Sequence, residues 1–119
     1  MLYTVLHLAT FTIISTFAHA DRQDPKPIRP VVHNGLRYVV LHMALDGKMK
    51  HNGGYVRVSN NRDGSPICTK QVYETKYNKN LESDNQDNFI TSLTVVKNVL
   101  AVRSENLPDI KIPLAGFCD

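Results

Sequence analysis

Asn-Gly and Asp-Gly dipeptides recur along the chain at short intervals, and they constrain its fold more than any other feature. They stand at Asn34-Gly35, Asp46-Gly47, Asn52-Gly53 and Asp63-Gly64. Such dipeptides tolerate positive φ and therefore favour tight reversals between antiparallel strands. The segments between them are rich in Val, Tyr, Ile, Leu and Thr, which favour extended structure. The pattern predicts a protein built from short β-hairpins.

Apolar alternation predicts about six or seven short antiparallel strands in an all-β fold, a small sandwich or barrel. The expected strands cover 36–45, 55–60, 67–77, 89–96, 99–104 and 110–114. The first is apolar on both faces, which is typical of a central strand. Lys97-Asn98 fits a two-residue hairpin loop, and Pro113 marks the last strand as a sheet edge because proline has no N–H. A helix over 67–77, and with it an α+β fold, is the alternative.

Residues 1–20 carry the features of a cleavable signal peptide. No charged side chain precedes Asp21, and the apolar run is short for a bilayer span. It ends in Ala18-His19-Ala20, the small-x-small pattern that signal peptidase accepts. A buried N-terminal helix is the alternative. The sequence predicts an extracellular protein without a membrane anchor, or a periplasmic one if the source is bacterial.

The remaining chain divides into an arm and one domain. Residues 21–30 hold three prolines among charged residues, which predicts an extended arm. Residues 31–119 form a single β-rich domain near the smaller end at which one core suffices. Cys68 and Cys118 are the two cysteines, and in an oxidising compartment they predict a disulfide. Two free thiols are the alternative.

Charge and motif spacing argue against several classes of function. The formal net charge of +3 comes from basic residues interleaved with acidic ones, whereas nucleic-acid-binding proteins usually cluster Lys and Arg on one face. The charge pattern therefore argues against nucleic acid as the partner. No Cys-x-x-Cys or His-x-x-x-His spacing occurs in the mature chain, and no phosphate-binding glycine loop. We expect neither a metal site nor a cofactor.

One catalytic alternative can be built from the side chains. Cleavage of RNA needs a base, an acid and a cation for the phosphate, and His42, Glu74 and Arg103 supply these residue types. Their spacing in the sequence does not require such a site. A histidine in an apolar strand is more often buried in the core than catalytic. His33 and His51 lie beside Asn-Gly turns and are expected to be exposed. A small hydrolase centred on His42 is the second hypothesis.

The chain loosely resembles the small secreted ribonuclease-like proteins of fungi, some of which are catalytically dead effectors. The resemblance rests on size, the export signal, the β-rich pattern and Gly116-Phe117-Cys118. Those proteins typically place the partner cysteine near the mature N-terminus, whereas the first cysteine here is Cys68. We assign no family.

A contact surface is the first hypothesis. On the strand expected over 67–77, alternation places four polar and aromatic side chains on one face: Gln71, Tyr73, Thr75 and Tyr77. Packing of Tyr73 in the core is the alternative for that position. The sequence therefore predicts a non-enzymatic protein that binds another macromolecule, with a protein as the expected target, as effectors, enzyme inhibitors and immunity proteins do.

Overall fold

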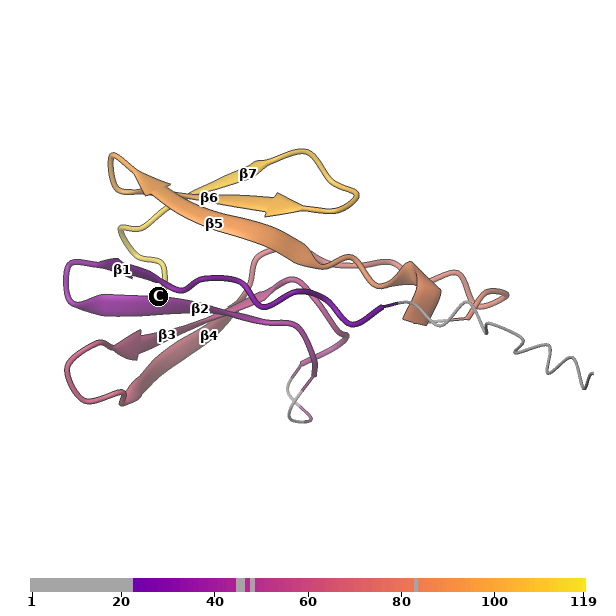
Figure 1. Ribbon diagram of the computed structural model, residues 1–119, viewed down its shortest axis with the longest axis horizontal. Coiled ribbons are helices and arrows are strands. Elements are labelled where there is room, and N and C mark those ends of the chain that lie inside the picture. The colour runs from indigo at the N-terminus through magenta and orange to yellow at the C-terminus, as the bar shows by residue number, and fades with distance from the viewer. Residues whose placement is uncertain (1–22, 45–46, 48, 83) are drawn as a thin grey trace, which may run out of the picture.

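The turns and strands predicted from the sequence form two antiparallel sheets (Figure 1). The computed structural model describes residues 23–44, 47, 49–82 and 84–119. The strands are β1 (Val31–His33), β2 (Leu36–Leu41), β3 (Tyr55–Asn60), β4 (Pro66–Gln71), β5 (Ile90–Val96), β6 (Val99–Ser104) and β7 (Ile110–Pro113). Among the described residues, helix is confined to the 3₁₀ turn η1 (Asp84–Gln86). The fold is all-β, as expected, and the signal peptide predicted over 1–20 lies outside the described residues.

The four-stranded sheet has the order β1-β2-β3-β4. Asn34 and Gly35 join β1 to β2 with φ of 48° and 75°, the left-handed conformation that their residue types were expected to adopt. β2 pairs with β1 on one side and β3 on the other, so the most apolar strand is internal. β4 forms the far edge, and a bulge interrupts its pairing with β3 between Val58 and Ser59.

The three-stranded sheet has the order β5-β6-β7. Lys97 and Asn98 both take positive φ, 49° and 60°, and place Val96 opposite Val99. This confirms the predicted two-residue hairpin. β7 is an edge strand that ends at Pro113, which confirms the edge expected from the proline.

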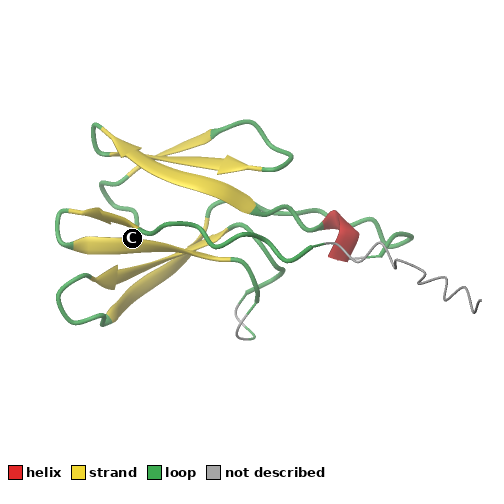
Figure 2. Ribbon diagram, viewed as in Figure 1, coloured by secondary structure: helices red, strands yellow, loops and turns green. Residues whose placement is uncertain are grey.

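The core lies between the two sheets, which face each other as the layers of a sandwich (Figure 2). Its fully or nearly fully buried side chains come from both sheets and two flanking segments: Tyr38, Val56, Val58, Tyr73, Ile90, Leu93, Leu100, Val102 and Phe117. Along β6 and over Val56–Val58 of β3, buried side chains alternate with half-buried or exposed ones, as in other sandwiches.

Two strands end earlier than the sequence predicted. β2 stops at Leu41 rather than at residue 45. In the loop that follows, Met49 packs with Leu41 and Tyr55 in a second, smaller cluster. β4 stops at Gln71 rather than at Tyr77, and residues 72–77 continue without strand pairing. No helix forms over 67–77, so the α+β alternative is wrong.

The predicted disulfide joins Cys68 to Cys118, with their Cα atoms 5.7 Å apart. It fixes the C-terminus beside β4, where the Phe117 ring meets Tyr38 edge-on at 5.5 Å between centroids. At the other end, residues 23–30 run without regular structure, and Ile28 packs against the core. In the part of the chain described here, no helix is long and apolar enough to cross a membrane.

Candidate binding surface

The three residues of the predicted acid–base set lie in separate surroundings. His42 follows β2, where its Nε2 lies 2.8 Å from the Lys26 carbonyl oxygen and its ring meets Phe89 edge-on. Arg103 is exposed on β6 and pairs with Asp109 at 3.3 Å. Glu74 is exposed after β4. No hydrogen bond or ion pair among the described residues joins any two of them, so the proton-transfer geometry is not assembled.

The predicted contact face turns inward instead of facing solvent. Tyr73 is only 8% exposed, and its hydroxyl donates to the Asn88 carbonyl. Gln71, Thr75 and Tyr77 are half-buried. Tyr73 packs in the core, which was the alternative prediction for this residue. These four side chains form one wall of a polar cluster at the end of the sandwich.

His51 stands at the centre of this cluster, and the expectation that it is exposed was wrong. It is 7% exposed, and its ring lies edge-on to Tyr55 and Tyr77 at 5.7 and 5.9 Å. The Thr75 N–H donates to Nε2 at 2.9 Å, so the ring proton sits on Nδ1, 3.0 Å from the Asn52 carbonyl oxygen. The loop after β2 folds back onto residues 72–77, which local turn chemistry could not reveal. His33, also expected to be exposed, is half-buried and bonded to Asn98 at 2.8 Å.

Buried hydrogen bonds extend the cluster to the segment before β5. Asp87 is 5% exposed and accepts from the Tyr77 hydroxyl and, at 3.2 Å, from the Asn52 amide. Burial, and then the bond to Asp87, raise the pKa of Tyr77 above its ordinary value. Burial, and then the charge of Glu105, raise the pKa of Tyr73. These bonds link the loop after β2, residues 73–77 and the segment before β5, while the buried Thr75 hydroxyl oxygen has no hydrogen-bond partner among the described residues.

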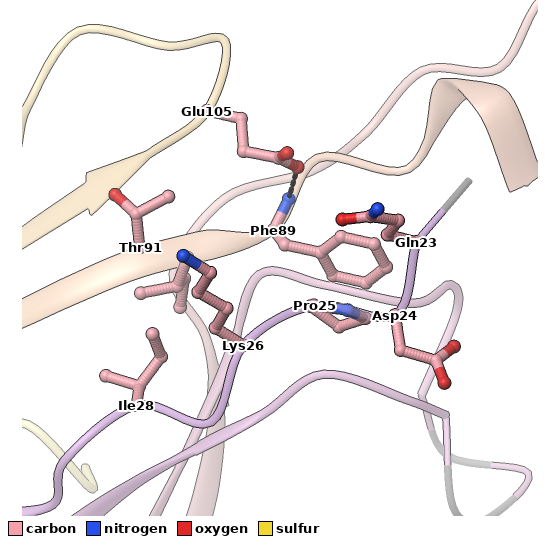
Figure 3. A pocket seen from close by; sticks show the side chains of 9 residues that line it. Gln23, Asp24, Pro25, Lys26, Ile28, Phe89, Thr91 and Glu105 are labelled. Atoms are coloured by element: carbon pink, nitrogen blue, oxygen red, sulfur yellow. Dashed lines mark hydrogen bonds between the residues drawn. The ribbon is translucent and has the colours of Figure 1, made fainter.

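A pocket of about 350 Å³ lies where the N-terminal arm meets the start of β5 (Figure 3). Pro25 and Phe89 both line it, and the Lys26 side chain extends toward Thr91. Its polar groups also serve internal contacts. Glu105 accepts from the Phe89 N–H at 2.9 Å, and the Lys26 carbonyl is held by His42. These contacts explain how the arm is held on the domain.

The outer face of the four-stranded sheet presents two arginines to solvent. The β2–β3 register pairs Arg37 with Ser59 and Val39 with Arg57, so both arginines project from one face on neighbouring strands. A groove of about 560 Å³ between them is lined by Arg37, Val39, Arg57, Ser59, Asn60, Asn61, Gly64 and Pro66. Among the described residues neither guanidinium has a carboxylate at ion-pair distance.

Sequence reasoning missed these arginines, although each alternates with buried neighbours. Arg57 lies between Val56 and Val58, which are fully buried, and is therefore turned outward. The hairpin register, which places Arg37 on the same side, was the missing information. We call the surface formed by Arg37, Val39, Arg57, Ser59 and Pro66 the outer basic face.

No known protein family, characterised protein or solved structure matches this chain. Within the described part of the chain, no group of three or more His, Cys, Asp or Glu side chains is placed to hold a metal ion.

Proposed function

We propose that this protein acts without catalysis, by binding an acidic segment of another protein on its outer basic face. The observation that carries the proposal is the pair Arg37 and Arg57, both exposed and free of ion pairs among the described residues, on one open sheet face. Arginine is enriched in protein interfaces and forms paired hydrogen bonds with carboxylates. A carboxylate partner would therefore satisfy donors that the fold leaves to water.

Apolar side chains beside the arginines support the same surface. Val32 of β1 lies opposite Arg37 and is 52% exposed, and Ile67 in β4 is 49% exposed. Burying such groups against a partner contributes about 25 cal/mol per Å². Guanidinium groups beside apolar surface are typical of the residues that dominate binding energy.

The separation of His42, Glu74 and Arg103 gives the hydrolase hypothesis no support, whereas the outer basic face supports binding. The Cys68–Cys118 disulfide is consistent with an oxidising compartment. Secretion, and a role of the effector, inhibitor or immunity type, are part of this proposal.

The test compares two variants with the same change in charge. In Arg37→Glu/Arg57→Glu the outer basic face becomes acidic, whereas in Lys97→Glu/Lys111→Glu two exposed lysines of the three-stranded sheet are reversed. Each protein, secreted with its disulfide intact, is used as bait in extracts of its source organism and of organisms that it contacts. Bound proteins are identified by mass spectrometry, and their Kd is measured with purified material.

The proposal expects a saturable partner whose affinity falls at least about tenfold in the arginine variant, since a hydrogen bond to a charged group contributes about 1.5–3 kcal/mol. The lysine variant should bind within about twofold of the wild type, and added salt should weaken binding. Recovery of no saturable partner, or equal binding by the two variants, would refute it.

A further inference from the structure

The free edge of β4 presents backbone groups that the sandwich does not use. The Val72 N–H donates to the Gly54 carbonyl at 2.7 Å. This bond shows which of the alternating residues of β4 direct their backbone groups toward β3. In an antiparallel pair, alternate residues bond to the neighbour and the others point away. Residues 68 and 70 therefore bond toward β3, while Thr69 and Gln71 direct their N–H and C=O groups outward.

The three other sheet edges are less suited to receiving a strand. β1 has three residues and β7 has four, of which the last is Pro113. β5 continues from the segment that holds the arm, and residues of β1 lie near it. β4 has six residues, and its pairing with β3 leaves the N–H groups of Thr69 and Gln71 on the open side of the strand. Short strands, prolines and bulges protect edges from added strands. In β4 the proline and the bulge both lie at the Pro66 end, and Cys68–Gln71 pairs with β3 in a regular register.

A groove accompanies this edge. It has a volume of about 250 Å³ and lies between β4 and the C-terminal turn, lined by Cys68, Thr69, Lys70, Gln71, Phe117, Cys118 and Asp119. The disulfide holds the turn in place, and the Lys70 ammonium lies 3.3 Å from the Phe117 carbonyl oxygen and 4.9 Å from the centre of its ring. A strand added to β4 would thus find a preformed wall on the inner side.

We propose that the acidic segment binds as an extended strand added to β4, an inference that rests on the proposed function. Thr69 lies opposite Arg57, so alternate side chains of the added strand would face the outer basic face and favour Glu or Asp. The intervening side chains would face the groove, whose lining holds one cation, Lys70, and one anion, Asp119, beside Phe117. Because these opposite charges leave no net charge there, the groove favours small apolar side chains. The segment is therefore one that alternates acidic and apolar residues.

A second copy of this chain fits the edge less well than an acidic segment. Two β4 edges paired with each other would bring the Lys70 side chains of both copies onto the same face of neighbouring strands. Like charges on neighbouring strands destabilise pairing. The lysine therefore disfavours self-association, and β4 itself carries no carboxylate to offer the arginines.

The experiment titrates the ¹⁵N-labelled, disulfide-intact secreted protein with the acetylated, amidated hexapeptide Glu-Val-Glu-Val-Glu-Val. A Lys-Val hexapeptide of the same alternation is the control for charge. Amide exchange rates and chemical shifts of Thr69 and Gln71 are followed. The Glu-Val peptide should slow exchange of these two amides at least about tenfold at saturation, and the Lys-Val peptide should not.

Two variants at one position separate the backbone from the side chain. Thr69→Pro removes the outward N–H, and an edge strand tolerates proline there because this N–H faces solvent. Thr69→Ala keeps the N–H. We expect Thr69→Pro to bind the Glu-Val peptide at least about fivefold more weakly, which corresponds to one net hydrogen bond, while Thr69→Ala stays within about twofold.

Each outcome decides between the two proposals. One outcome is that the peptide binds the wild type without slowing amide exchange at Thr69 and Gln71, and that Arg37→Glu/Arg57→Glu abolishes this binding. This outcome would support the outer basic face as the binding surface and overturn strand addition. Absence of binding by the Glu-Val peptide at millimolar concentration would overturn strand addition as well, while the bait experiment above decides the proposed function independently. If Thr69→Pro does not fold, the exchange rates of the wild-type amides decide alone.

Discussion

Gly53 lies where the loop after β2 passes close to the segment before β5, and replacing it with alanine tests how tightly these two segments pack. Its φ is +76°, and an added Cβ would lie 2.3 Å from the Asn88 carbonyl oxygen and 3.1 Å from the carbonyl carbon. Because these neighbours are backbone atoms, no side-chain rotation relieves the contact. Gly64 has the same backbone conformation, φ +75°, but an added Cβ there meets nothing within 4 Å.

The two substitutions therefore share one energetic cost and differ in another. A non-glycine residue in the left-handed region costs about 1–2 kcal/mol at either position. Forcing a methyl group into packed structure costs a further 1–3 kcal/mol or so, and this cost applies to Gly53 alone. The lower chain entropy of alanine in the unfolded state is common to both variants and cancels in their difference. Gly53→Ala should lose about 1–3 kcal/mol more than Gly64→Ala.

Urea denaturation of the disulfide-intact protein measures both free energies of unfolding. The wild type is the reference, and similar m-values in all three proteins would show that the difference reflects stability rather than a change in the unfolded state. Equal losses in Gly53→Ala and Gly64→Ala would refute the close approach of Gly53 to Asn88. The buried placement of the His51 cluster, which this loop covers, would then be wrong too.

Two further predictions concern the disulfide and the buried tyrosines. Cys68 and Cys118 are 50 residues apart, so the double alanine variant should lose about 4 kcal/mol in urea denaturation, and a loss below about 1 kcal/mol would contradict the chain-entropy argument. Burial raises the pKa of Tyr73 and of Tyr77 above the ordinary value of about 10, so above pH 10 the unfolded chain loses protons that the folded chain keeps. Stability should be retained below pH 10 and fall as the pH rises further. Tyr77→Phe should flatten this fall in thermal melts between pH 8 and 11, and an unchanged slope would contradict the assignment.

Local signals predicted the hairpins because a tight turn is determined by the residues within it. Asn34, Gly35 and Asn98 adopt the positive φ that their residue types tolerate, and Lys97 adopts it within the same two-residue turn as Asn98. Each turn fixes the register of the strands that it joins. The sandwich follows from the same alternation, since each strand has one side for the core. The disulfide could also be predicted from the sequence, because two cysteines allow a single intramolecular pairing.

The end of β4 shows where alternation fails as a guide. Alternation places Tyr73 on the same face as Thr69 and Gln71, yet Thr69 is exposed and Tyr73 packs in the core. The change occurs where the chain leaves the sheet, after the last backbone bond to the β3 side, from the Val72 N–H to the Gly54 carbonyl. Beyond the end of a strand, the face that alternation assigns to a side chain therefore no longer predicts its burial.

The candidate site depended on contacts between segments distant in sequence. His51 is buried because it accepts the N–H of Thr75, 24 residues later. Alternation shows which side chains share a face within one strand, but not which faces of two strands coincide. The pairing register of β2 and β3 was therefore needed to show that Arg37 and Arg57 lie on the same face.

The buried cluster and the outer basic face are connected through β4. The cluster fixes the chain just after the strand, where Thr75 bonds to His51 and the Gln71 amide lies 3.3 Å from the Tyr73 carbonyl oxygen. The disulfide fixes the middle of the strand at Cys68. An edge held at both places loses little conformational freedom when a partner strand is added, and such preorganisation strengthens binding without any new contact. The buried polar groups would thus contribute to recognition by keeping Thr69 and Gln71 in the extended conformation that an incoming strand requires.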